Sequence, residues 1–371
     1  MTKNRVDFTE RHIEGKWAKY LPAISGFYTT HLGKDLADPN FVPPERWGLY
    51  SAGHAERNLA KCDDREPMIH KREEGTILIG DSGGFQIATG VIKLDWATDR
   101  TLEGWAFAGI NMKNMKTVLE RILDLRRDGL LEGKDWIHFL GIGRLDWACY
   151  LTSIERLLKK YDNPNINISF DAASPFVAAG GYALSYNYNY FKPDQLTYAM
   201  GRGIDSKDLK DKKIAMPFQG PIMERLYASD MCVMGPGDLN KHGKEGKTSW
   251  DTTTYALVMA HNVYNHIQAV QEINRLADIE YATRTKIDYR DWYQGRKKTN
   301  ASIKELLDPS NKDPYTMLAE NQAFLDFVSF GDKKAVTTFG SLFGGDEEEH
   351  HEPTGEEMAA PGQDDLIQID E

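Results

Sequence analysis

From residue 76 onward, short apolar runs alternate with longer amphipathic segments, and this rhythm constrains the fold more than any other feature of the chain. The amphipathic segments place apolar side chains such as Val118, Ile122 and Leu125 on one helix face. Strands that alternate with helices predict a parallel sheet with helical crossovers, either a (β/α) barrel or an open α/β sheet. The strand candidates are 76–80, 104–109, 136–141 and 166–170, and the helix candidates are 111–130 and 144–161.

Aspartates stand at the ends of two predicted strands. Asp81 follows the run TILIG, and Asp171 follows INISF. Active residues of (β/α) barrels and open α/β sheets lie at the carboxyl ends of strands. Each aspartate precedes small residues, in DSGG and DAAS, which let a substrate approach the backbone closely. Paired carboxylates suit glycosidic chemistry, in which one attacks C1′ of a sugar and the other handles the proton. Each aspartate could equally cap a helix.

The other segments carry weaker patterns. Prolines interrupt residues 1–75, which we expect to pack on the barrel as an N-terminal segment. Residues 174–195 are rich in Gly, Tyr and Asn, which is typical of a loop, whereas 212–223 resembles a further strand. Residues 251–279 predict a long helix with Asp251 as its N-cap. The main domain is therefore expected to span 76–330, followed by an acidic, disordered tail over 331–371.

The net charge of −11 arises from the end of the chain. Residues 346–371 hold eleven Asp and Glu and no Lys or Arg, which leaves 56 − 11 = 45 acidic residues against 45 basic ones in the rest. This neutral body allows a polyanionic partner if basic groups gather locally. No apolar run is long enough to span a membrane, so no membrane partner is expected.

Cysteine usage indicates a reducing compartment. The three cysteines, Cys62, Cys149 and Cys232, are isolated and form no CxxC pair. A disulfide framework or a cysteine-rich zinc site is therefore not expected. The N-terminus has no apolar signal segment, and we expect a cytoplasmic protein, in the host cytoplasm if a phage encodes it.

Four motifs resemble the tRNA-guanine transglycosylase superfamily. DSGGFQ (81–86) resembles the base-binding motif of that family, and HFLGIG (138–143) its glycine-rich strand before the nucleophile. SFDAASPF (169–176) resembles the nucleophile strand, and MAHNVYNHIQAVQEIN (259–274) the helix after the zinc site. The motifs occur in the family's order. The segment GWAFAGIN and its neighbours are similar to the branch found in phages and bacterial DNA-modification clusters, which exchanges guanine in DNA for a 7-deazaguanine.

The resemblance implies a fold, a reaction and a set of site residues. The fold would be a TIM-like (β/α)8 barrel, and the reaction would pass through a covalent aspartyl–nucleic acid intermediate on a flipped-out guanosine. Asp171 would be the nucleophile, and Asp81 would act in proton transfer and base recognition. The base would be bound by Ser82, Gly83, Phe85, Gly109 and Ile110, with Phe85 stacking on it. Free 7-deazaguanine would be the second substrate.

The chain departs from the family pattern in two places. The family zinc site uses three clustered cysteines and a histidine. In this chain His261 matches the histidine and Cys232 is a lone candidate for a cysteine ligand, but the cysteine cluster is missing. We therefore expect no metal and no cofactor. Only residues 87–103 separate the first motif from GWAFAG, where the family has about two strand–helix units, so the barrel is either shortened or completed by other segments.

Three functions are consistent with these features. The first is a DNA guanine transglycosylase. The second is a tRNA-guanine transglycosylase of the queuine type, although no RNA-binding C-terminal module is apparent. The third is a non-catalytic or split subunit that binds nucleic acid or a partner chain that supplies the missing units. Separately, the resemblance implies a homodimer, since relatives in the family often dimerise.

Overall fold

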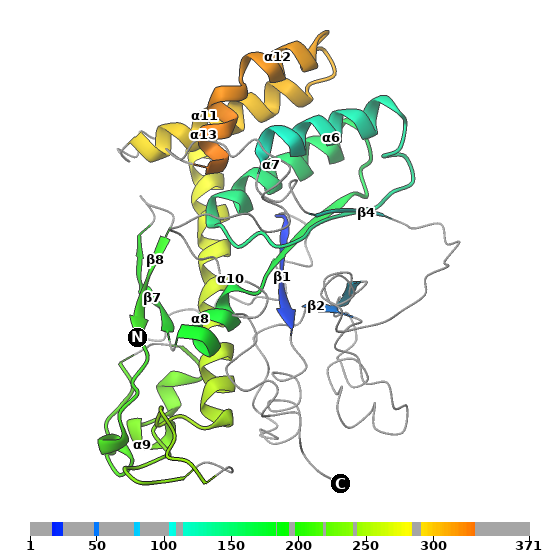
Figure 1. The fold of residues 1–371 in the computed structure, drawn as a ribbon. Coiled ribbons are helices and arrows are strands. Elements are labelled where there is room, and N and C mark those ends of the chain that lie inside the picture. Colours follow the sequence, from blue (N-terminus) through cyan, green and yellow to red (C-terminus); the bar gives the residue numbers. More distant parts are fainter. Residues whose placement is uncertain are drawn as a thin grey trace, which may run out of the picture.

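A computed structural model describes residues 17–24, 48–51, 78–81, 104–108, 114–182, 184–192, 197–217, 220–239, 243–283 and 291–330. Over these residues the protein is a mixed α/β structure, with a six-stranded parallel sheet and a separate two-stranded hairpin (Figure 1). No helix within these ranges is long and apolar enough to cross a lipid bilayer. The predicted tail, residues 331–371, lies outside the described residues.

The sheet confirms the parallel arrangement predicted from the alternating pattern. Its strands lie in the order β3-β2-β1-β6-β5-β4, and each neighbouring pair is parallel. The order differs from the 3-2-1-4-5-6 order of doubly wound dinucleotide-binding sheets, because β1 pairs with β6 and not with β4. The strands are β1 (Lys19–Ile24), β2 (Gly48–Ser51), β3 (Leu78–Asp81), β4 (Gly104–Phe107), β5 (Trp136–Phe139) and β6 (Asn167–Ala172).

Two of these strands correct the expectation for residues 1–75. That segment was expected to pack on the barrel, but it supplies β1 and β2 to the sheet, with β1 between β2 and β6. Both strands are short, and Pro22 lies within β1, which obscured the pattern. Pro22 pairs with Ala172, the last residue of β6, and a proline is tolerated most easily where a ladder ends.

Helices α6 (Met115–Arg127) and α7 (Leu145–Tyr161) confirm the two predicted crossovers. The side chain of Asn114 caps α6 by accepting a hydrogen bond from the backbone N–H of Thr117. Both helices carry basic residues in their last turn, where they complement the negative end of the helix dipole. A bidentate ion pair from Arg126 to Asp162 joins the end of α6 to the end of α7.

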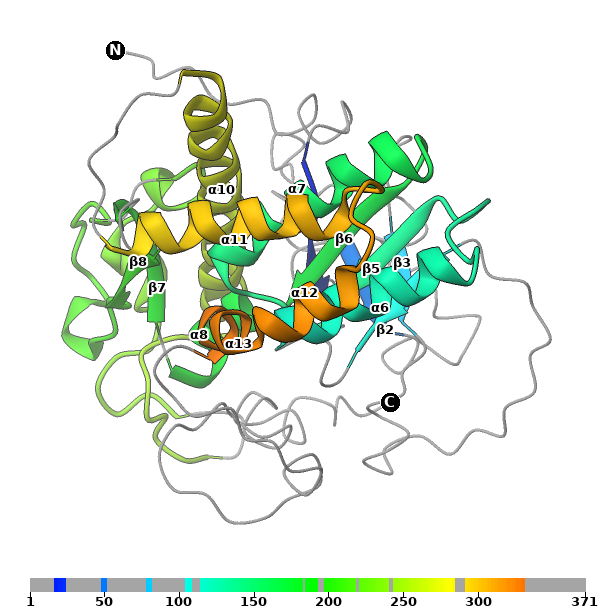
Figure 2. The same cartoon turned by 90° about the horizontal axis from the view of Figure 1, so that it is seen from above.

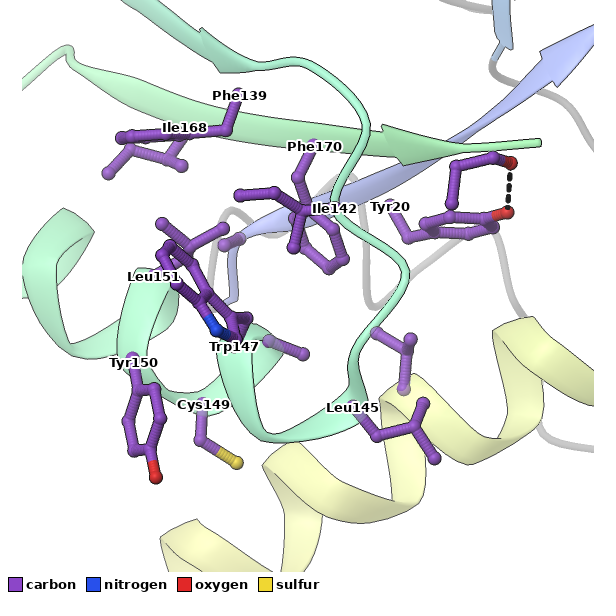
Figure 3. Close-up of a cluster of buried hydrophobic side chains, with 14 of the residues drawn as sticks. Tyr20, Phe139, Ile142, Leu145, Trp147, Cys149, Tyr150, Leu151, Ile168 and Phe170 are labelled. Atoms are coloured by element: carbon purple, nitrogen blue, oxygen red, sulfur yellow. Dashed lines mark hydrogen bonds between the residues drawn. The ribbon is translucent and has the colours of Figure 1, made fainter. Parts of the chain in front are cut away.

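The apolar core lies between the sheet and these helices. Strand residues Phe139, Ile168 and Phe170 are fully buried and form one cluster with Trp147 and Leu151 of α7 (Figure 3). Burying a side chain of this size stabilises the fold by roughly 1.5–3 kcal/mol. Successive side chains of a strand point to opposite faces. The residues of β5 and β6 that lie between these core residues therefore point to the opposite face of the sheet and lie outside this core.

A long helix and three C-terminal helices complete the structure (Figures 1 and 2). Helix α10 (Thr252–Thr283) confirms the prediction for 251–279 and packs against α7 and against α8 (Ser174–Tyr182). Helices α11 (Asp291–Leu307), α12 (Pro314–Glu320) and α13 (Gln322–Phe330) pack on α6 and α7. Arg144, which precedes α7, donates to the carbonyl oxygens of Val328 and Ser329 and so holds the end of α13.

Two predictions between α7 and α10 are wrong. Residues 174–195 are not a loop: they form α8 and then β7 (Leu184–Lys192), which pairs in antiparallel fashion with β8 (Thr197–Arg202). The alternation in YNYNY is a strand pattern that outweighs its high content of Asn. Residues 212–223 are not a strand; Ala215 forms one isolated bridge with Tyr227, among the short helices η3 (Lys207–Leu209), η4 (Met223–Arg225) and α9 (Ala228–Met231).

Asp251 caps α10 as predicted, and its removal should cost stability. Its Oδ1 accepts hydrogen bonds from the backbone N–H of Thr254, at 2.8 Å, and from the Thr254 hydroxyl, at 3.0 Å. We expect Asp251→Ala to lower the free energy of unfolding by about 1 kcal/mol, and Asp251→Asn, which keeps a capping oxygen, by much less. Urea denaturation of the three proteins measures this, and equal losses in both variants would contradict the capping role.

His266 of α10 should make the protein less stable in acid. Its ring packs on that of Tyr20, with centroids 4.5 Å apart, and burial lowers its pKa to about 3. In the unfolded chain the pKa of histidine is about 6.5, so between these values the unfolded chain binds a proton that the folded protein does not. Acid therefore favours unfolding, by up to about 1.4 kcal/mol per pH unit.

The test compares the wild type with His266→Leu by urea denaturation across this pH range. We expect the wild type to lose stability more steeply than the variant as pH falls below about 6.5, and the two curves to run parallel above it. Parallel curves over the whole range would show that His266 does not titrate differently in the two states.

Candidate active site

Strands β5 and β6 have an apolar face and a polar face, and Asp171 lies on the polar one. The register aligns His138 of β5 with Ser169 of β6, and Ser169 with Lys19 of β1. Alternation along each strand then places Trp136 and Asp171 on that same face. Its polar side chains are nevertheless buried: 4% of His138, 0% of Ser169 and 5% of Asp171 is exposed.

A continuous hydrogen-bond network crosses this face from Trp136 to Asp171. Trp136 Nε1 donates to Ser169 Oγ over 2.7 Å, and Ser169 Oγ lies 2.7 Å from His138 Nδ1. On the other side of the ring, His138 Nε2 lies 3.2 Å from Asp171 Oδ1. The network thus joins alternate residues of β5 to alternate residues of β6, and its geometry follows from the register of the two strands.

The loop after β5 supplies a second donor to the same carboxylate oxygen. The backbone N–H of Gly141 donates to Asp171 Oδ1 over 3.0 Å. Gly141 has φ +73°, in the left-handed region that favours glycine. Two residues later, a Cβ on Gly143 would lie 2.9 Å from Ser174 Oγ and 3.1 Å from Ala172 Cβ. The glycines of HFLGIG therefore let this loop approach the end of β6 closely.

Lys19 lies at the end of the polar face where β5 and β6 begin. Its Nζ donates to Asn167 Oδ1 over 2.9 Å, lies 3.9 Å from Glu155 Oε2, and lies 5.7 Å from the centre of the Trp136 ring. Burial lowers the pKa of the Lys19 ammonium, and the charge of Glu155 opposes that shift. Lys19 therefore holds the position of Trp136 at the start of the network.

The two oxygens of Asp171 differ in their surroundings. Oδ1 has two donors, His138 Nε2 and the N–H of Gly141, whereas no described residue donates a hydrogen bond to Oδ2. The Tyr20 hydroxyl donates to the carbonyl of the next residue, Ala172, over 3.0 Å and fixes the end of β6 (Figure 3). The carboxylate is therefore held through one oxygen, and its other oxygen accepts a hydrogen bond from no described residue.

The network contains the residue types of a hydrolase triad in a different arrangement. In a Ser-His-Asp triad the histidine bonds the serine Oγ through Nε2 and the carboxylate through Nδ1. Here Nδ1 of His138 faces Ser169 and Nε2 faces Asp171. Ser169 is fully buried, and its Oγ already accepts the indole N–H of Trp136. Ser169 is therefore a link in the network, which ends at the Asp171 carboxylate.

The other predicted carboxylate, Asp81, lies in β3, three strands from β6. Its backbone pairs with Ser51 of β2. Asp171 is level with Leu21 of β1. Gly80 pairs with Tyr50, which pairs with Ile24 of β1, three residues after Leu21. Asp81 therefore lies 3 + 1 = 4 residues further along the strand direction than Asp171. An even offset puts the two positions on the same face of the sheet. The other predicted base-binding residues, Ser82, Gly83, Phe85, Gly109 and Ile110, lie outside the described residues.

The residues that match the family zinc site have other contacts. Cys232 Sγ lies 3.4 Å from the carbonyl oxygen of Ile204, to which it donates. His261 is buried, and its Nε2 lies 2.9 Å from Asn265 Nδ2 on the same helix. No cluster of three or more His, Cys, Asp or Glu that could hold a metal ion occurs within the described ranges.

The sequence analysis named Asp171 as a candidate but did not predict its hydrogen-bond partners. Trp136, His138 and Ser169 lie in segments that were predicted to be strands, and none of the three was named as a candidate site residue. A signal was present, because ISFD alternates apolar and polar residues with a period of two, and WIHF has the polar His138 between Ile137 and Phe139. That alternation predicts a strand with one polar face, and it places His138 on the same side as Trp136.

Comparisons with protein-family models, with curated proteins and with solved structures find no match to this chain. The resemblance to the transglycosylases therefore rests on the four motifs alone. Any assignment of function depends on those motifs and on the geometry at the end of β6.

A pair of glycine variants separates the backbone role of Gly141 from its contact with Asp171. Gly141 and Gly133 both have positive φ, +73° and +66°, but a Cβ on Gly133 would meet no atom within 4 Å. We expect each change to alanine to cost about 1 kcal/mol of stability. Only Gly141→Ala should also shift the ¹³C resonance of the Asp171 carboxylate. An unchanged resonance in Gly141→Ala would show that this N–H does not hold Oδ1.

Proposed function

We propose that this protein is a guanine transglycosylase that acts on DNA, with Asp171 as the nucleophile. The observation that carries the proposal is the state of that carboxylate: Oδ1 is held by His138 and Gly141, and Oδ2 accepts from no described residue, at the carboxyl end of a central strand. This is the position at which α/β enzymes place reactive groups. The family resemblance assigns the nucleophile to the same residue.

The strand order supports a barrel in this proposal. From β1 to β3 and from β4 to β6, each strand lies beside the next strand of the sequence, and β6 lies beside β1. A (β/α) barrel has this cyclic order, so the sheet corresponds to a barrel that is interrupted between β3 and β4. In a flat sheet, three strand spacings of about 4.8 Å would separate β3 from β6 by about 14 Å. Curvature would bring Asp81 towards Asp171.

The proposed reaction exchanges one base for another at C1′ in two steps. Asp171 Oδ2 forms a bond to C1′ while the C1′–N9 bond breaks, its electron pair passes to N9, and guanine leaves after taking a proton. The incoming 7-deazaguanine then loses its N9 proton and attacks C1′, which releases the carboxylate. Asp81 would move the proton between the two bases. The steps balance without a metal, a redox cofactor or a nucleotide cofactor.

The proposed partners are DNA and the free 7-deazaguanine base, in the cytoplasm. The sequences of the motifs favour DNA over tRNA as the substrate, because they are similar to those of the DNA-modifying branch. The tRNA-directed reaction uses the same nucleophile and is distinguished by the substrate alone. A split subunit that needs a partner chain would bind nucleic acid without forming a covalent adduct by itself.

Covalent trapping tests the proposal. Purified protein is incubated with guanine-containing duplex DNA, or with tRNA, and denatured, and adducts are separated by electrophoresis. We expect an adduct with DNA, none with Asp171→Asn, and a normal amount with Asp128→Asn. Asp128 is a matched control because it is an exposed carboxylate paired only on the surface with Arg127.

Each outcome assigns the protein to one of the candidate functions. An adduct with tRNA alone would replace DNA with tRNA as the substrate. No adduct with either nucleic acid, from protein with native circular dichroism, would contradict the proposal and favour the split subunit. An adduct that persists in Asp171→Asn would assign the nucleophile to another residue.

A further inference from the structure

The direction of the hydrogen-bond network is set by Trp136. An indole N–H only donates, so Ser169 Oγ must accept at that contact. The hydroxyl then has one proton of its own, and its other partner in the network is His138 Nδ1, at 2.7 Å. When Ser169 donates this proton, Nδ1 is the acceptor nitrogen, and the ring proton must be on Nε2.

The same direction suits the other end of the network. The Nε2–H tautomer presents a donor to Asp171 Oδ1, 3.2 Å away. The opposite tautomer would present a lone pair to the carboxylate and would make Ser169 accept twice, which leaves the hydroxyl proton of a fully buried side chain without an acceptor. One arrangement of protons therefore satisfies all four side chains.

We propose that His138 is a positioning residue for Asp171, held in its Nε2–H tautomer by Ser169 and Trp136. The imidazole and the Gly141 N–H stop rotation of the carboxylate about its Cβ–Cγ bond and place their hydrogen bonds on Oδ1 alone. The lone pairs of Oδ2 are left unoccupied by any described donor, and the oxygen has a fixed direction, as an attacking oxygen needs. The role of the oxygen rests on the proposed transglycosylase function, whereas the tautomer does not.

Nuclear magnetic resonance of ¹⁵N-histidine-labelled full-length protein tests the tautomer without any substrate. The resonances of His138 are assigned by their loss in His138→Gln. We expect the wild type to show an unprotonated Nδ1 and a protonated Nε2 at neutral pH. In Ser169→Ala, Nδ1 loses its donor, and the spectrum should move towards a mixture of tautomers. A wild-type spectrum with a protonated Nδ1 would overturn the proposal.

Single-turnover adduct formation tests the positioning role. In His138→Gln the amide nitrogen can occupy the place of Nε2, in His138→Asn it falls near Nδ1, and in His138→Phe no donor is left. We expect His138→Phe and His138→Asn to slow adduct formation by about 10- to 100-fold, as loss of a hydrogen bond to a charged group predicts. His138→Gln should restore most of the rate, and the Kd for DNA should change little in all three.

The two measurements separate failure of this inference from failure of the proposed function. If the wild type forms no adduct but shows the Nε2–H tautomer, the transglycosylase function fails and the network stands. If the wild type forms the adduct and His138→Phe forms it equally fast, the positioning role fails and the function stands. If a His138 variant does not fold, the rate of adduct formation in Ser169→Ala decides the positioning role, and a rate equal to that of the wild type would overturn it.

Discussion

Strand β6 is paired on both sides, with β1 and with β5, and the candidate site depends on this double pairing. The pairing with β1 sets Asp171 level with Leu21, which is 150 residues earlier in the chain. Such a long loop is costly to close in entropy, and the apolar face of the same strand, with Ile168 and Phe170 in the core, offsets that cost. The packing that stabilises the sheet thus also fixes the position of the carboxylate.

The polar face of β5 and β6 is difficult to explain by stability alone. A buried polar group costs free energy unless it has a partner, and hydrophobic residues of similar size would avoid that cost. Trp136, Ser169 and His138 form hydrogen bonds with one another, and the network ends at Oδ1 of Asp171. The other oxygen of this carboxylate, Oδ2, accepts from no described residue. An oxygen that accepts from no described residue suits the nucleophilic role that we propose for Asp171.

Local patterns predicted the local elements, and they did not predict the register. Helices α6, α7 and α10 follow from apolar periodicity, and α10 also follows from its N-cap Asp251, because both signals are encoded within a few turns. Strands β1 and β2 are 6 and 4 residues long and are stabilised by partners far away in sequence, so their own residues carry little signal. Asp171 was found because it ends an apolar run; His138 was not, because only the register shows that it faces Ser169.

The register also bears on how the sheet could close. Between Asp81, the last residue of β3, and Gly104, the first of β4, the chain has 103 − 81 = 22 residues. A parallel crossover needs about a dozen residues or more, whereas a further βαβ unit needs roughly 30. The connection is therefore long enough to join β3 to β4 as neighbours, but too short to insert another strand and helix between them. Since β6 already pairs with β1, closure of this sheet by its own chain would give a ring of six strands.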